Sequence, residues 1–115
     1  MADKTLFTKI IDLEIPAKFV YQDELCIAIE DIDPKAPIHN LIIPRKPVAG
    51  IQAVEAGDEA LLGHLLMVAH QLAEKHGLTA NGFRVVINAG DQGGQSVPHL
   101  HLHLLGGRRM GWPPG

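Results

Sequence analysis

Residues 99–105 read His-Leu-His-Leu-His-Leu-Leu, a strict alternation of imidazole and aliphatic side chains. Successive side chains of a β-strand point to opposite faces, so the alternation predicts a strand whose leucines enter the core. The imidazoles of His99, His101 and His103 would then share the other face. On such a strand, adjacent histidines lie about 6–7 Å apart and the outer two about 13 Å apart.

The segments around this strand predict a small α+β domain. Helical spacing of apolar residues indicates a short helix at residues 6–11 and one long helix at 58–76, which Gly77 would cap. Short apolar runs bounded by polar residues predict further strands at residues 19–22, 26–30, 39–44 and 83–88. Several strands with few helices favour a mostly antiparallel sheet with a helix packed on one face.

Length and charge restrict the classes of protein that fit. The 115 residues, 46% hydrophobic and 20% charged, suit one domain over residues 1–115, with a short tail at 1–4 and a second tail at 106–115. The formal net charge is −3, and Lys and Arg together number only 10. A protein that grips a nucleic-acid backbone usually carries a basic surplus, so we expect no polymeric nucleic acid as partner. A single nucleotide is compatible with this charge.

Cys26 is the single cysteine, so the sequence allows no intrachain disulfide and no cysteine-rich zinc site. Its apolar neighbours predict a buried thiol that packs as a small hydrophobic group. The sequence also contains no signal-peptide pattern and no apolar stretch of membrane-spanning length. We therefore expect a cytoplasmic protein without a membrane partner.

Three interpretations compete for the histidine row. It can be an exposed polar face, although three histidines at a period of two are an unusual choice for one. It can be a metal site, but outer imidazoles about 13 Å apart would struggle to reach one zinc ion at bond lengths of about 2.0–2.1 Å. It can also serve catalysis on phosphorus, since neutral imidazole is a good nucleophile near pH 7. We favour catalysis without a metal or cofactor, and His101, which has an imidazole on each side, is the expected nucleophile.

The residues before the histidine row support chemistry on a phosphate. Residues 90–96 contain adjacent glycines, whose backbone N–H groups can approach an anion closely. Ser96 supplies a hydroxyl that can protonate a leaving group, and Asn88 offers an amide donor. The three histidines at 64, 70 and 76 follow a six-residue spacing on the long helix, which does not place them on one face. We expect these three to be surface residues.

The pattern His, hydrophobic, His, hydrophobic, His, hydrophobic, hydrophobic at 99–105 resembles that of the histidine triad (HIT) superfamily. Within it, the chain is similar to the histidine triad nucleotide-binding proteins, which are purine nucleoside phosphoramidases. The similarity runs from about Leu6 to the C-terminus. Further segments that carry it are Lys9-Ile10-Ile11, Ile15-Pro16-Ala17, Asp31-Ile32, Pro34, Ala36-Pro37, His39, Asn88, Gly93-Gly94-Gln95-Ser96, Gly106-Gly107-Arg108 and Trp112-Pro113-Pro114-Gly115.

The resemblance implies a five-stranded antiparallel sheet with one long and one short helix, paired into a ten-stranded sheet in a homodimer. It implies hydrolysis of adenosine 5′-phosphoramidates, and of aminoacyl adenylates, through a nucleotidyl-histidine intermediate that releases AMP. The tail at 106–115 would reach the partner's site, with Trp112 near the leaving group.

The resemblance also assigns roles to individual residues. His101 would be the nucleophile, with His99 and His103 flanking the phosphate and His39 completing the cluster. Ser96, Asn88 and the backbone of Gly94 and Gln95 would hold the phosphate and the leaving group. Asp31 would accept the ribose hydroxyls. The purine pocket would be formed by Leu6, Phe7, Ile10, Ile15 and Ile32.

Two other functions fit the same residues. One is dinucleoside polyphosphate hydrolysis, which resembles another branch of the superfamily. The other is a nucleotide-binding regulatory module whose turnover is incidental. The Gly-Gly-Gln-Ser loop and the Trp-Pro-Pro-Gly ending favour the phosphoramidase.

Overall fold

The computed structural model describes residues 4–115, so the first three residues of the expected N-terminal tail lie outside the described part. Lys4, the remaining residue of that tail, forms ion pairs with Asp12 and Glu14 at 2.8 and 3.0 Å. Within the described range the elements in chain order are α1 (Leu6–Ile11), β1 (Phe19–Gln22), β2 (Cys26–Glu30), β3 (Ile38–Pro44), η1 (Ile51–Ala53), η2 (Ala56–Asp58), α2 (Glu59–Lys75), β4 (Phe83–Val86) and β5 (Leu102–Gly106).

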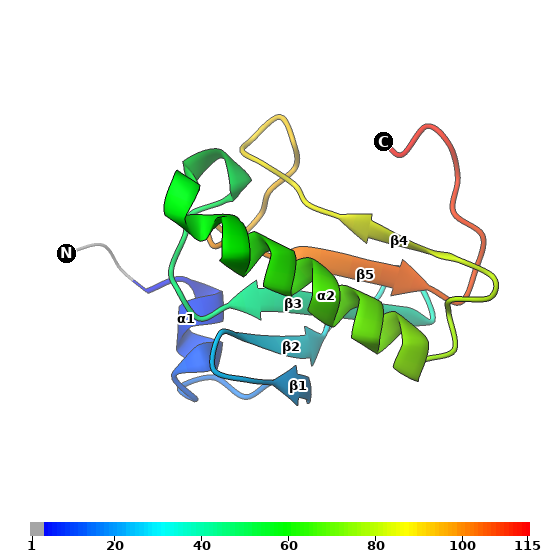
Figure 1. Cartoon of the computed structure of the whole chain (residues 1–115), viewed down its shortest axis with the longest axis horizontal. Coiled ribbons are helices and arrows are strands. Elements are labelled where there is room, and N and C mark those ends of the chain that lie inside the picture. Colours follow the sequence, from blue (N-terminus) through cyan, green and yellow to red (C-terminus); the bar gives the residue numbers. More distant parts are fainter. Residues whose placement is uncertain (1–3) are drawn as a thin grey trace.

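The strands form one antiparallel sheet in the order β1-β2-β3-β5-β4 (Figure 1). This confirms the predicted fold class, a five-stranded antiparallel sheet with one long and one short helix. The histidine-bearing strand β5 pairs on one side with β3 and on the other with β4, so His103 lies between Leu41 and Val86. Its backbone position is therefore held from both sides.

Local sequence explains where each helix begins and ends. The Thr5 hydroxyl caps α1 by accepting the N–H of Thr8 at 3.2 Å. After α1, Leu13 adopts a left-handed backbone with φ of 63°, which reverses the chain. At the other helix, Gly77 with φ of 70° follows the last turn of α2 and donates to Glu74 O, which confirms the predicted glycine cap.

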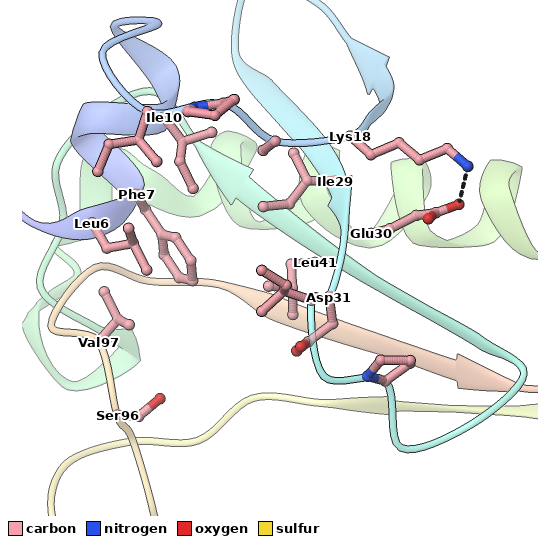
Figure 2. Close-up of a pocket in the computed structure, with 15 residues that line it drawn as sticks. Leu6, Phe7, Ile10, Lys18, Ile29, Glu30, Asp31, Leu41, Ser96 and Val97 are labelled. Carbon is pink, nitrogen blue, oxygen red and sulfur yellow. Dashed lines mark ion pairs between the residues drawn. The ribbon is translucent and has the colours of Figure 1, made fainter.

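The two helices cover opposite faces of the sheet. On one face, α1 packs Phe7 and Ile10 against alternate residues of β2 and β3, and Figure 2 shows this side with Ile29 and Leu41. The buried members of this cluster are Phe7, Ile10, Ile27, Ile29, Leu41 and Ile43. Residues 26–29 are thus apolar toward both faces, which is why they form a continuous apolar run in the sequence.

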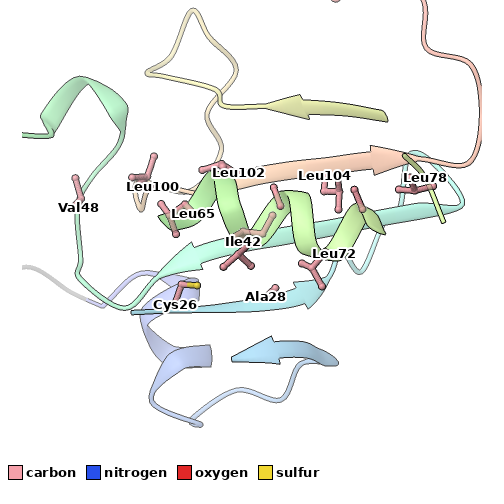
Figure 3. Close-up of a cluster of buried hydrophobic side chains, with 13 residues drawn as sticks. Cys26, Ala28, Ile42, Val48, Leu65, Leu72, Leu78, Leu100, Leu102 and Leu104 are labelled. Carbon is pink, nitrogen blue, oxygen red and sulfur yellow. The ribbon is translucent and has the colours of Figure 1, made fainter. Parts of the chain in front are cut away.

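On the other face, α2 packs across the sheet and forms the main core (Figure 3). Leu100, Leu102 and Leu104 are at most 1% exposed in this core, as the alternation at 99–105 predicted. Cys26 is also completely buried there, so the prediction of a buried thiol is confirmed. Among residues 4–115, neither helix has the length and apolarity that crossing a bilayer requires.

The predicted strand at 99–105 is wrong at its start, because β5 begins at Leu102 and extends to Gly106. Ile42 is the last residue of β3 that pairs with β5, so the ladder starts at Leu102. Before that point, the ring of Pro98 restricts the backbone φ angle at the entry to the histidine row. The N–H of Leu100 donates instead to Val48 O at 2.7 Å. The predicted strand at 83–88 is similarly too long, since β4 ends at Val86, where its pairing with β5 stops. The turns η1 and η2 were not predicted.

Candidate active site

A cleft of about 620 Å³ opens on the α1 face of the sheet (Figure 2). Seven residues that the sequence assigned to a nucleotide site line it: Leu6, Phe7, Ile10, Ile15, Asp31, Ile32 and Ser96. Figure 2 places the Asp31 carboxylate and the Ser96 hydroxyl at one end of a cavity with mostly apolar walls, and the Lys18–Glu30 ion pair borders another part of it. The wall also contains residues that sequence reasoning did not single out, notably Ile29, Leu41 and Val97.

The orientation of His101 follows from one short hydrogen bond. Its Nδ1 lies 2.8 Å from the carbonyl oxygen of His99, which can only accept, so Nδ1 carries the proton. The lone pair therefore resides on Nε2. The ring is 4% exposed, and burial lowers its pKa below the ordinary value, which keeps it neutral near pH 7. Phe7, which lines the cleft, meets this ring edge-on with centroids 4.8 Å apart.

His39 and His103 form a hydrogen-bonded pair beside His101. The Lys35 N–H donates to His39 Nδ1 at 3.0 Å, so the proton of neutral His39 is on Nε2. That Nε2–H donates to His103 Nδ1 at 2.9 Å, which leaves a proton on His103 Nε2. The ring centroids of His101 and His103 are 5.0 Å apart. A bare imidazole nitrogen and an imidazole N–H donor thus stand next to each other.

Asp31 connects this histidine pair to the cleft. Its Oδ2 lies 3.4 Å from His39 Nε2, and its Oδ1 accepts the Asp33 N–H at 2.8 Å. The turn between β2 and β3 therefore holds the carboxylate rigidly. A carboxylate offers about four lone-pair positions, so capacity remains for hydroxyl donors from a ligand.

His99 lies in the interior, where protein groups surround its ring. It is 1% exposed, and its Nε2–H donates to Pro44 O at 2.8 Å. Its Nδ1 is the remaining acceptor, and the Thr8 and Thr5 hydroxyls lie 3.4 and 3.5 Å from it. Both ring nitrogens of His99 therefore bind protein groups, and the side chain ties α1 to the end of β3.

The glycine-rich loop is tied internally in this structure. The N–H groups of Gly94 and Gln95 donate to Asp91 O and Gly90 O, both at 3.0 Å. The Gln95 side chain donates to Ala49 O at 2.7 Å and accepts the Gly90 N–H at 2.9 Å. Gly94 has φ of 78°, which a residue with a side chain rarely adopts. The two predicted phosphate donors thus close the turn, and Ser96 is the loop residue that lines the cleft.

Several predicted residues lie away from the cleft. Asn88 is half-buried two residues beyond β4 and is not part of the cleft lining. Trp112 is 83% exposed in the C-terminal tail, which Arg84 contacts through Gly111 O at 2.7 Å. Among the helix histidines, His70 is exposed as predicted, but His64 and His76 are half-buried, and His64 lies 2.6 Å from the Asp23 carboxylate.

Comparisons with known proteins agree with this arrangement. A model of the HIT domain matches residues 12–110. An uncharacterized HIT-like protein of Synechococcus elongatus is 53% identical over the full length of both chains. The crystal structure of a HIT family hydrolase from Legionella pneumophila matches with a TM-score of 0.95 and 50% identity, covering 97% of this chain and 100% of that chain. This chain belongs to the HIT domain family.

A histidine triad nucleotide-binding protein from Candida albicans shares the HIT fold at 30% identity and a TM-score of 0.82, over 96% of this chain and 83% of that chain. The resemblance read from residues 99–105 is therefore confirmed at the level of the family. In this HIT protein the four histidines are not equivalent: His101, His103 and His39 form a contiguous cluster, while His99 supports it from the interior.

A metal-compatible grouping also exists, in a different place from the one that the sequence suggested. Asp31, His39 and His103 each offer one ligand atom, and these atoms lie within 4.8 Å of one another. The spacing argument compared only the three histidines at 99–103 and missed His39, which comes from β3. In the structure, hydrogen bonds among these three side chains and from the Lys35 N–H already occupy this cluster.

Acidification is expected to destabilise the protein between about pH 6.5 and about pH 4. Burial, with smaller contributions from His101 and His39, lowers the pKa of His103 to about 4. In the unfolded chain this group titrates near 6.5, so between these values the unfolded state binds a proton that the native state does not. The free energy of unfolding therefore falls as the pH drops, by about 2 kcal/mol from His103 at about pH 5.

Urea unfolding at about pH 7.5 and about pH 5 measures this loss, and His103→Asn serves as the control. The pKa values of His39, His99 and His101 are lowered in the same direction, so the variant should keep part of the pH dependence. An unchanged difference between the two pH values in His103→Asn would contradict the assignment.

Proposed function

We propose that this HIT protein hydrolyses purine nucleoside 5′-phosphoramidates, those of adenosine and the related aminoacyl adenylates in particular. The observation that carries the proposal is the state of His101: its Nδ1–H is held by the His99 carbonyl, which leaves the Nε2 lone pair free to attack. A nucleophile oriented in this way by a fixed acceptor is the arrangement that covalent catalysis needs.

The proposed reaction has two displacements at phosphorus. In the first, His101 Nε2 bonds to phosphorus, the phosphorus–nitrogen bond breaks, and the departing amine takes a proton. In the second, water attacks the nucleotidyl-histidine and returns a proton to the group that protonated the amine, which releases AMP and restores the neutral imidazole. His103 Nε2–H can donate to a phosphoryl oxygen, and the Ser96 hydroxyl can supply the leaving group's proton.

The shape and polarity of the cleft support a nucleotide as substrate. Apolar side chains from α1 and β2 can enclose the faces of a purine ring, as ligand sites commonly do. At the polar end, Asp31 can accept hydrogen bonds from both ribose hydroxyls. The cleft contacts the histidine cluster through Phe7 and Asp31, so a nucleotide bound there would bring its 5′-phosphorus toward His101.

The functional unit in this proposal is a cytoplasmic homodimer. Strand β4 lies at an edge of the sheet, where a second copy can add its own β4 to make ten strands. Phe83 on β4 and the α2 residues Leu66 and Met67 are exposed apolar groups that such a dimer would cover. The C-terminal tail, with its exposed Trp112, would then reach the partner's site. The tail begins at residue 107 and not at the predicted 106, because Gly106 belongs to β5.

The test compares substrates in the wild-type protein. We expect turnover of a fluorogenic adenosine phosphoramidate, unchanged after treatment with a chelator, and an adenylyl group on the protein after acid quenching. If diadenosine polyphosphates are cleaved faster than the phosphoramidate, the activity is dinucleoside polyphosphate hydrolysis and the proposal is wrong. Nucleotide binding without turnover of either substrate would favour the regulatory module.

A further inference from the structure

A second cluster of ligand-type side chains lies on the α2 face of the sheet, away from the cleft. Asp23 is in the β1–β2 turn, Cys26 begins β2, and His64 projects from α2. One ligand atom from each of the three lies within 4.8 Å of the others. Figure 3 shows the Cys26 sulfur on this face, in the same core as Leu65. Cys26 is fully buried, while the side chains of Asp23 and His64 keep 24% and 31% of their surface exposed, so the cluster opens to solvent on one side.

The carboxylate of this cluster is held in a fixed direction. Its Oδ1 accepts the N–H groups of Leu25 and Cys26, both at 2.8 Å. Its Oδ2 is thereby turned toward the Tyr21 hydroxyl and His64 Nε2, each 2.6 Å away. Hydrogen bonds that orient a ligand in this way are the usual support around metal sites. The nearby Arg45 guanidinium donates to the Asp23 carbonyl oxygen at 2.8 Å, so it sits on the backbone side of the turn.

We propose that Asp23, Cys26 and His64 bind a thiophilic divalent ion, for which Zn²⁺ is the best fit. One thiolate, one imidazole and one carboxylate are the donor types that zinc takes, and the Tyr21 hydroxyl or a water can complete a tetrahedron from the open side. Zinc bonds of about 2.0–2.3 Å separate tetrahedral ligands by about 3.4–3.8 Å. The contact between Asp23 and His64 must therefore open by about 1 Å, and half-buried His64 has room to move outward.

Metal binding also changes where the protons of the ligands lie. The Cys26 thiol loses its proton to solvent and binds as the thiolate. His64 binds through Nε2, the nitrogen that faces Asp23 in the metal-free state, so the ring then carries its proton on Nδ1. The Cys26 thiol thus releases one proton for each ion bound. The ion would fasten the β1–β2 hairpin to α2, which is a structural role independent of the proposed catalysis.

Cobalt provides a probe that separates this site from the histidine cluster. Cys26 is the only cysteine, so a thiolate-to-cobalt absorption band in the near ultraviolet can arise only from this site. Titration of the full-length protein with Co²⁺ should produce that band, together with the visible bands of a tetrahedral ion, at one ion per chain. Zn²⁺ should then displace the cobalt and release about one proton per ion.

The variants decide the outcome. Cys26→Ser should lose the near-ultraviolet band, and His64→Gln should weaken Co²⁺ binding at least about tenfold. His103→Asn, which alters the cluster on the opposite face, should leave the band unchanged. Because Cys26→Ser changes a buried side chain, circular dichroism checks its fold, and a Zn²⁺-dependent rise in Tm that is lost in His64→Gln gives a second readout. Absence of the thiolate band in wild type, or full binding by His64→Gln, overturns the proposal.

Discussion

Replacing His101 with alanine is expected to reduce kcat/KM for an adenosine phosphoramidate by at least about a thousandfold, because covalent catalysis loses its nucleophile. The adenylylated protein trapped from wild type should be absent from the variant. Alanine leaves the His99 carbonyl without its donor, but the ring of His101 is the only part of the network removed. The expected effect is therefore on chemistry more than on folding.

His70→Ala is the matched control for this experiment. That histidine is exposed on α2, and within residues 4–115 its one ion-pair partner is Glu74 one turn later, so its loss should leave both turnover and the covalent intermediate unchanged. Steady-state kinetics and intact-mass measurements on acid-quenched samples supply the readouts. Wild-type turnover by His101→Ala would remove this residue from the proposed role, whichever substrate is used.

The second large effect concerns stability. Leu102→Ala should lower the free energy of unfolding by about 3 kcal/mol, because Leu102 is 1% exposed between the sheet and α2, and the truncation leaves a cavity. For a domain of this size, that loss corresponds to a fall in Tm of roughly 12 °C.

Leu13→Ala is the comparison for Leu102→Ala, since it removes the same atoms from a side chain that is 78% exposed. Its effect should stay within about 0.5 kcal/mol. Urea unfolding and thermal scans on both variants test the contrast. If both variants lose the same free energy of unfolding, the leucines at 100–104 do not stabilise the core as the structure indicates.

The histidine row shows which structural features the sequence predicts and which it does not. Alternation alone predicted that the leucines enter the core, and it also placed His101 and His103 together, because a side-chain period of two follows from strand geometry. It could not reveal that pairing begins only at Leu102, since that depends on Ile42 being the last residue of β3 that pairs with β5.

Residues distant in the chain account for the rest. His39 joins the cluster because β3 pairs with β5, and the resemblance to the family, not the local pattern, pointed to it. His99 looked equivalent to its neighbours until Pro44 and the threonines of α1 were seen to bind its ring. The grouping of Asp23, Cys26 and His64 had no sequence signal, because its members come from a turn, a strand and a helix that only folding brings together.

The acceptor that orients His101 is a backbone carbonyl, and every amino acid supplies one. Mutational drift at position 99 therefore changes packing and the anchoring of α1, yet it cannot delete the group that fixes the tautomer two residues later. In evolutionary terms, the reactive nitrogen of His101 is preserved as long as the backbone keeps its path. Selection on the side chain at position 99 therefore concerns its packing in the interior.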